Sequence, residues 1–285
     1  MAYTTLLSVA QLNELMKSGA PLVLLDCSHD LTDPQAGPRA YASGHLPGAH
    51  FLSMEKDLGG TKTGLNGRNP LPAREDFVKR MRALGADDDT QVVVYDRTQA
   101  TYASRAWWTL RWLGHTSVAV LDGGLQAWQA AGHPVEQVLT ALPAEGGFTD
   151  RGASMPVVSF EDVLATLGKN THLIVDARAE DRFRGENETL DPMGGHIPGA
   201  ISRFYRHNLT AAGTFKSPQE LRAELVQLVG SRTGPELIMQ CGSGVSACHN
   251  LLALEMAGLG TSPLYIGSWS EWCARPNAPI ATGPA

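Results

Sequence analysis

Short, unbroken apolar runs recur along the chain, and longer amphipathic stretches separate them. Such runs predict strands that are covered on both faces, because a strand with one solvated face alternates apolar and polar residues instead. Strands that alternate with helices favour an α/β fold, a mainly parallel sheet flanked by helices on both sides. The predicted strands are Leu22–Leu25, Val92–Tyr95, Val118–Leu121, Leu173–Val175 and Leu237–Met239.

Three helices have clear limits in the sequence. The run Ser217-Pro218-Gln219-Glu220 predicts a helix start, with serine at the N-cap, proline at the first position and glutamate at the third. Two further helices are predicted over Ala103–Leu113 and Ser246–Gly258, the second ending at its glycine.

The chain also repeats itself. Gly44–Ala49 (GHLPGA) matches Gly195–Ala200 (GHIPGA), and Val92–Asp96 matches Leu237–Cys241 in the same order. Repeats that keep their order indicate a duplicated domain. We therefore expect two tandem domains of the same α/β fold, at residues 1–142 and 157–285. The segment 143–156, rich in Gly and Pro and without periodicity, is the expected linker.

Composition and charge exclude several classes of protein. The chain has 285 residues, of which 43% are hydrophobic and 18% charged, as in ordinary globular proteins. A net charge of −6 gives no electrostatic footprint for nucleic acid or an anionic membrane. No apolar run is long enough for a membrane span, and the N-terminus lacks the features of a signal peptide. Four cysteines without zinc-type spacing favour a cytoplasmic protein with no disulfide framework and no metal.

One cysteine stands where a nucleophile would. Cys241 ends a predicted strand and is followed by a glycine-bearing loop and a predicted helix. That order directs backbone N–H groups and the positive end of a helix dipole at the sulfur, which favours the reactive thiolate. The matching position in the first half is Asp96, so only the second domain is expected to be catalytic. Cys27, Cys248 and Cys273 are expected to be packing residues.

Three motifs resemble those of the two-domain rhodanese-type sulfurtransferases. Tyr41–Ala49 (YASGHLPGA) is similar to the amino-terminal signature of that family, and Gly267–Trp272 (GSWSEW) to its carboxyl-terminal signature, although Ile266 stands where an acidic residue is usual. The loop Cys241–Ala247 (CGSGVSA) is similar to that of the 3-mercaptopyruvate branch. Thiosulfate-preferring members tend to carry basic residues after the cysteine, whereas this chain has Gly242 and Ser243.

The resemblance implies a chemistry for the loop. The Cys241 thiolate would take sulfur from 3-mercaptopyruvate, become a persulfide, release pyruvate and pass the sulfur to thioredoxin, a small thiol or cyanide. Backbone N–H groups would cradle the persulfide without any metal or organic cofactor. A monomer would suffice. The cradle consists of Gly242, Ser243, Gly244, Val245, Ser246 and Ala247.

The resemblance also implies substrate-binding residues. Arg182 matches the arginine that holds the donor's anionic group, which needs a fixed cationic fork. Ser243 would work with a histidine and an acid, and by alignment the acid falls on or near Glu55 while Asn69 replaces the histidine. A second family arginine aligns near Asp191. We hypothesise that Arg68 supplies that charge from the first domain.

Three alternatives compete with this assignment, and the sequence disfavours the phosphatase among them. The replaced histidine and arginine keep a thiosulfate:cyanide sulfurtransferase in consideration. A phosphatase of the same fold would need an arginine closing a longer cysteine loop, and the residues after Ser246 are Ala247, Cys248 and His249. In the third alternative, Cys241 stores persulfide for a partner without catalysis.

Overall fold

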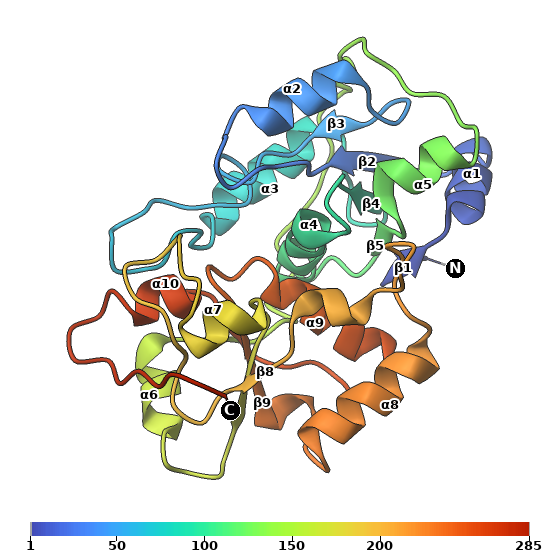
Figure 1. Cartoon of the computed structure of the whole chain (residues 1–285). Helices are drawn as coiled ribbons and strands as arrows, with labels where there is room; N and C mark the ends of the chain where they lie inside the picture. The colour runs from blue at the N-terminus through green and yellow to red at the C-terminus, as the bar shows by residue number, and fades with distance from the viewer. Residues whose placement is uncertain (1, 285) are drawn as a thin grey trace. The chain divides into compact units, whose positions relative to one another are not determined.

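The computed structural model describes residues 2–284, and Figure 1 shows the ribbon. The chain forms two compact units. The first contains the chain up to Gly60, Pro72–Ser154 and Ala212–Thr214, and the second contains Thr61–Leu71, Met155–Ala211 and the chain from Phe215 onward.

This grouping differs from the expected division in one segment that matters for function. Residues 61–71, which the sequence placed in a first domain of residues 1–142, pack with the second unit. The expected linker, residues 143–156, also has a fixed place over most of its length. Phe148 is fully buried and its amide donates to the Ala86 carbonyl at 3.0 Å, which holds this segment on the first unit.

The first unit is built on a five-stranded parallel sheet with strand order β1-β5-β4-β2-β3. Parallel neighbours need crossover connections, and helices supply most of them. The strands are β1 (Leu6–Leu7), β2 (Leu22–Asp26), β3 (His50–Phe51), β4 (Gln91–Tyr95) and β5 (Val118–Leu121). The helices are α1 (Val9–Lys17), α2 (Ala36–Ser43), α3 (Arg74–Ala83), α4 (Thr101–Trp112) and α5 (Gly124–Ala130).

Helices cover both faces of this sheet. On one face, Val93 and Leu121 pack with Leu12 of α1 and Trp128 of α5 in one buried cluster. Because alternate residues of a strand point to opposite faces, Val92 and Val94 lie on the other face. Helix α4, with Trp107 fully buried, packs against β4 and β5.

The second unit repeats this architecture. Its parallel sheet has the order β6-β10-β9-β7-β8, which matches the first sheet strand for strand. The strands are β6 (Val157–Val158), β7 (Leu173–Asp176), β8 (Ile201–Ser202), β9 (Leu237–Gln240) and β10 (Leu264–Tyr265). The helices are α6 (Phe160–Thr166), α7 (Glu180–Arg184), α8 (Pro218–Val229), α9 (Ala247–Met256) and α10 (Ser268–Trp272), with short 3-10 turns η1 (Tyr205–Asn208) and η2 (Gly234–Glu236). The predicted fold class is confirmed.

Local sequence signals are reproduced closely. Helix α8 begins with the predicted capping box, in which the Glu220 amide donates to Ser217 Oγ at 3.3 Å and the Ser217 amide donates to Glu220 Oε2 at 2.9 Å. Helix α9 ends at Met256, two residues before Gly258. Because glycine readily adopts a positive φ, here 66°, it lets the chain turn away from the helix end.

The repeated histidines are structural in both units. His45 stacks on Tyr41 with ring centroids 3.9 Å apart, and His196 stacks on Phe183 at 3.8 Å. In each pair a ring Nδ1 lies 2.9 Å from a backbone carbonyl oxygen. The same arrangement in the unit without a nucleophile indicates a role in shaping the turn.

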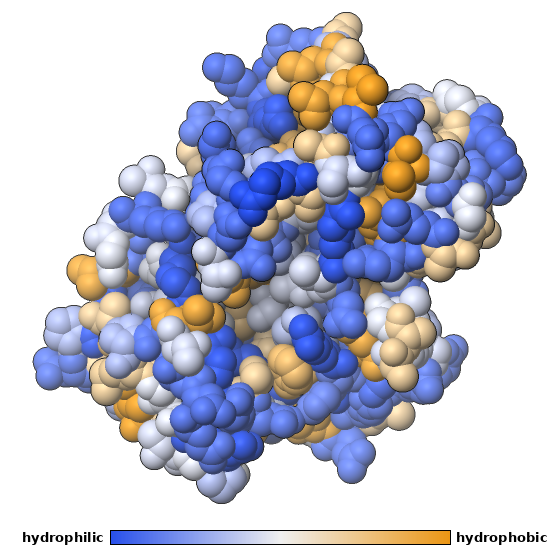
Figure 2. Space-filling view, turned by 45° about the horizontal axis from the view of Figure 1, so that its top comes forward, coloured by the Kyte–Doolittle hydropathy of each residue, from blue (hydrophilic) through white to orange (hydrophobic). Residues whose placement is uncertain are grey.

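The face of the molecule shown in Figure 2 is mainly polar. Figure 2 shows hydrophilic residues over most of the displayed face, with separate, small apolar patches. Among residues 2–284, no helix combines the length and the apolar character that a membrane crossing requires.

Candidate active site

Cys241 lies at the carboxyl end of the central strand β9, directly before the loop that leads into α9. This edge is where ligands bind in parallel α/β sheets. Its side chain is buried and its backbone is fixed on both sides. The Cys241 amide donates to Ser268 Oγ at 3.2 Å, and its carbonyl accepts from the Trp269 amide at 2.9 Å.

Ser268 has an unusual backbone for a residue that is not glycine. Its φ is +52°, in the left-handed region, and the matching residue of the first unit is Gly124 at +57°. The serine hydroxyl donates to the Tyr265 carbonyl at 2.9 Å while it accepts from Cys241. A strained residue kept at such a place indicates a positional constraint, and here the constrained neighbour is the cysteine.

The first unit shows what the loop geometry binds. Asp96 stands at the position of Cys241, and its carboxylate accepts four backbone N–H groups of its own loop and helix start. The donors are Thr98, Ala100, Tyr102 and Ala103, at 2.8, 2.9, 2.8 and 3.0 Å. Convergent amides of this kind form an anion-binding nest. The duplicated loop is therefore shaped to hold a negative charge.

In the second unit the protein supplies no such anion. The amides of Ser243, Val245 and Ala247, which match three of the donors to Asp96, reach no hydrogen-bond acceptor within residues 2–284. In the first unit the matching amides converge on the side chain of Asp96, so we expect these amides to face the side chain of Cys241. The loop can thus stabilise an anionic extension of the Cys241 sulfur.

Two arginines meet beside Gly242. A Cβ atom added at Gly242 would lie 2.9 Å from Arg68 Nη2 and 3.6 Å from Arg182 Nη2. A side chain at residue 242 would therefore displace at least Arg68. The small residue after the cysteine makes room for two guanidinium groups from distant segments, and both segments belong to the second unit.

Two buried carboxylates hold these guanidinium groups. Arg182 donates from Nε and Nη2 to Glu188 at 3.0 and 2.9 Å, a bidentate pair. Asp191 bridges the arginines, because one carboxylate oxygen bonds Arg68 and the other lies 3.4 Å from Arg182 Nη2. Burial by itself would raise the pKa of Glu188, but bonds from the Leu190 amide and Arg182 outweigh it and hold that pKa below its ordinary value.

The segment that carries Arg68 is docked through backbone contacts. Gly67 has a φ of +79° and approaches Gly267 so closely that a Cβ would lie 2.6 Å from the Gly267 carbonyl oxygen. The Arg68 amide donates to Ser270 Oγ at 3.0 Å. These contacts place Asn69 so that its Nδ2 donates to Ser243 Oγ at 2.9 Å.

A third arginine, which the sequence reasoning missed, lies deeper. Arg178 is buried, binds Asp176 with Nη2–Oδ2 at 2.6 Å and lies over the Trp269 ring at 4.5 Å. Burial would lower the pKa of Arg178, but the charge and hydrogen bonds of Asp176 raise it, with smaller contributions from Glu188 and Cys241. The internal repeat could have indicated this residue. The matching residue of the first half is Ser28, so the arginine occurs only in the half that carries the nucleophile.

The remaining cysteines fit packing roles. Burial, with the charges of Asp26 and Asp96, raises the pKa of the Cys27 thiol well above its ordinary value. Burial also raises the pKa of Cys273, to about 11. Cys248 donates its S–H to the Gly244 carbonyl at 3.4 Å. Thiols held in the neutral form are poor nucleophiles, which leaves Cys241 as the candidate.

Two other features lie in the first unit. Glu55 is exposed on a turn of that unit, so its part in the site stays a prediction.

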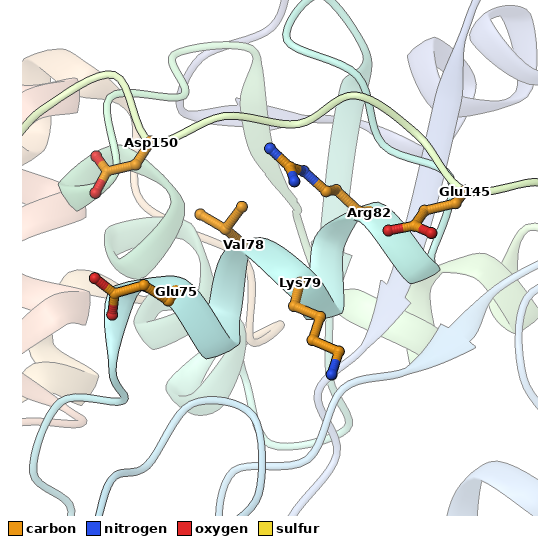
Figure 3. Close-up of a pocket in the computed structure, with 6 residues that line it drawn as sticks. All are labelled: Glu75, Val78, Lys79, Arg82, Glu145 and Asp150. Atoms are coloured by element: carbon orange, nitrogen blue, oxygen red, sulfur yellow. The ribbon is translucent and has the colours of Figure 1, made fainter.

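A pocket of about 350 Å³ lies between α3 and the segment 145–150 (Figure 3). Its charged groups are partly engaged already, since Arg82 donates to the Phe148 carbonyl and Asp150 pairs with Arg74, and we assign it no ligand.

Comparison with known proteins agrees with this geometry. The rhodanese-like domain matches residues 8–131 and again residues 159–275. This chain belongs to the rhodanese-like family. The second rhodanese-like range contains the Cys241 loop and both carboxylates, and the first contains Asp96.

Full-length relatives carry two different activity names. A Pseudomonas aeruginosa protein described as "Probable 3-mercaptopyruvate sulfurtransferase" is 42% identical and aligns over 99% of this chain and 100% of its own length. A thiosulfate sulfurtransferase of Cricetulus griseus is 34% identical over 99% of this chain and 96% of its own. The crystal structure of SseA from Escherichia coli, a 3-mercaptopyruvate sulfotransferase, superposes with a TM-score of 0.80 at 31% identity, covering 94% and 99% of the two chains.

Proposed function

We propose that this rhodanese-like protein is a sulfurtransferase that takes sulfur from 3-mercaptopyruvate and releases pyruvate. The observation that carries the proposal is the loop after Cys241. In the first unit the same loop geometry holds the Asp96 carboxylate with four amides, so in the second unit it suits an anion formed on Cys241. A cysteine persulfide is such an anion.

In the first step the Cys241 thiolate attacks the sulfur of 3-mercaptopyruvate. An S–S bond forms, the C–S bond of the donor breaks, and its electron pair passes to the methylene carbon as the enolate of pyruvate. One proton then converts the enolate to pyruvate. Amides of Ser243, Val245 and Ala247 stabilise the persulfide, as preorganised donors do for developing charge.

Ser243 supports the developing enolate. Asn69 Nδ2 donates to Ser243 Oγ, so the serine's own hydrogen points elsewhere and is available to the donor's carbonyl oxygen. An amide cannot accept a proton as a histidine would. Ser243 therefore acts in this protein as a neutral hydrogen-bond donor, and the proton for the enolate comes from water or the incoming thiol.

Arg182 and Arg68 bind the donor's carboxylate. Their guanidinium groups flank Gly242, one residue from the nucleophile. A small α-keto acid held there by charge-assisted bonds presents its sulfur to Cys241. In the second step a thiol acceptor, thioredoxin or a small thiol, attacks the outer sulfur, and the Cys241 thiolate leaves. Cyanide can take that sulfur as well.

A thiosulfate sulfurtransferase is the second candidate. Two adjacent guanidinium groups also suit a sulfonate-type dianion. In addition, Asn69 replaces the histidine of the mercaptopyruvate branch and cannot act as a base. The test is a comparison of kcat/KM for the two donors with the same thiol acceptor. We expect 3-mercaptopyruvate to be the better donor, and a clear preference for thiosulfate would contradict the proposal.

The Ser243→Ala variant tests the role given to the hydroxyl. We expect kcat with 3-mercaptopyruvate to fall roughly 10- to 100-fold, because one donor to a developing oxyanion is removed. Transfer from thiosulfate forms no enolate and should change less, which makes it an internal control. Stopped-flow measurement of single turnovers with each donor gives both values, and equal losses with the two donors would contradict the enolate role.

A further inference from the structure

We propose that Asp191 makes the site select its sulfur donor by charge, favouring a singly charged donor over a doubly charged one. The inference rests on the proposed function. It concerns the Asp191 carboxylate, which contacts the two arginines proposed to bind the donor, Arg68 and Arg182.

Asp191 is placed for this effect by direct contacts. Its side chain is only 3% exposed, and its two oxygens reach Arg68 and Arg182. The Asp191 amide donates to Glu188 Oε1 at 3.1 Å, which ties the bridging residue to the second carboxylate. The carboxylate therefore lies among the groups that would meet the donor's anionic end.

The charges of this cluster cancel. Arg68, Arg182 and Arg178 contribute three positive charges. Asp191, Glu188 and Asp176 contribute three negative charges. The arginines thus offer directed hydrogen bonds without net attraction. A donor's carboxylate must also share Arg68 with Asp191, and every further negative charge on the donor adds repulsion from that residue.

The size of the effect depends on donor charge in a defined way. Coulomb energy is proportional to the charge of the ligand, so the fold-change that removal of Asp191 produces for a dianion is about the square of that for a monoanion. We expect Asp191→Asn to raise affinity roughly threefold for monoanions and roughly tenfold for dianions. Asparagine keeps the shape and one acceptor oxygen for Arg68.

The experiment uses two readouts at constant ionic strength. One is kcat/KM for 3-mercaptopyruvate and for thiosulfate. The other is the dissociation constant of pyruvate and of sulfate, measured by calorimetry in a Cys241→Ser background, where no sulfur transfer interferes. The matched control is Glu186→Gln, which removes one negative charge from an exposed carboxylate paired with Arg184 on the same segment.

The outcomes separate the two proposals. One ratio is kcat/KM for thiosulfate over that for 3-mercaptopyruvate, and the other is the affinity for sulfate over that for pyruvate. A rise of both ratios in Asp191→Asn but not in Glu186→Gln supports the inference. Unchanged ratios, equal gains for both charges, or the same shift in both variants overturn it. A wild-type protein that forms no persulfide from 3-mercaptopyruvate overturns the proposed function instead, and the sulfate and pyruvate affinities still test Asp191. Denaturant unfolding of each variant shows that the comparison is made on folded protein.

Discussion

Cys241→Ser is expected to abolish sulfur transfer, lowering kcat/KM by roughly 10⁴-fold or more, as removal of an enzyme's nucleophile does. The hydroxyl is not ionised near neutral pH and cannot carry sulfane sulfur. Mass spectrometry of the wild-type protein after incubation with 3-mercaptopyruvate should show one added sulfur atom on the peptide containing Cys241. The variant should show none.

Cys273→Ser is the matched control for this experiment. Cys273 lies in the same unit, and burial raises the pKa of its thiol to about 11, so it stays protonated at neutral pH. This variant should keep its persulfide and its activity. Persulfide found on a cysteine other than Cys241, or turnover retained in Cys241→Ser, would contradict the assignment of the nucleophile.

Arg182→Ala is expected to give the second largest loss. Removing one partner of a buried, charge-assisted pair costs about 2–5 kcal/mol, which corresponds to a decrease in kcat/KM of roughly 30-fold or more. Most of the decrease should appear in KM for 3-mercaptopyruvate. Arg68→Ala should act in the same direction, because its guanidinium group reaches the same place beside Gly242.

Arg184→Ala controls for the loss of an arginine from α7. Arg184 is in the last turn of the same helix, but it pairs with the exposed Glu186. Its removal should leave KM unchanged.

If Arg68→Ala leaves KM for 3-mercaptopyruvate unchanged, Arg68 is not a substrate residue, whatever the result for Arg182. Arg178 lies 3.6 Å from Glu188, so we expect that carboxylate to keep a cationic neighbour when Arg182 is replaced.

Much of the fold could be predicted because its signals are local. Unbroken apolar runs such as Val92–Tyr95 predict buried parallel strands, and β4 covers this run with one more residue at its start. The capping box at Ser217 specifies its helix start through three neighbouring residues. The duplication was visible in the sequence and predicted two domains of the same fold, and in the structure the two sheets also share their strand order.

The placement of residues 61–71 could not be predicted in this way. Sequence order assigned Arg68 and Asn69 to the first domain, whereas this segment packs with the second unit. The responsible contacts are the close approach of Gly67 to Gly267 and the bond from the Arg68 amide to Ser270. Neither glycine nor serine marks such a contact in a sequence, because both are common in ordinary loops.

The sequence by itself determined the fold class, the duplication and the order of strand, glycine-bearing loop and helix around Cys241. Those features depend on local periodicity and on residues close together in the chain. Only the tertiary structure decided what surrounds that cysteine. The resemblance predicts a second family arginine near Asp191, and folding places Arg68 against this carboxylate across 123 residues of chain. Charge balance and hydrogen-bond direction around Cys241 depend on such long-range pairs, which local sequence patterns do not encode.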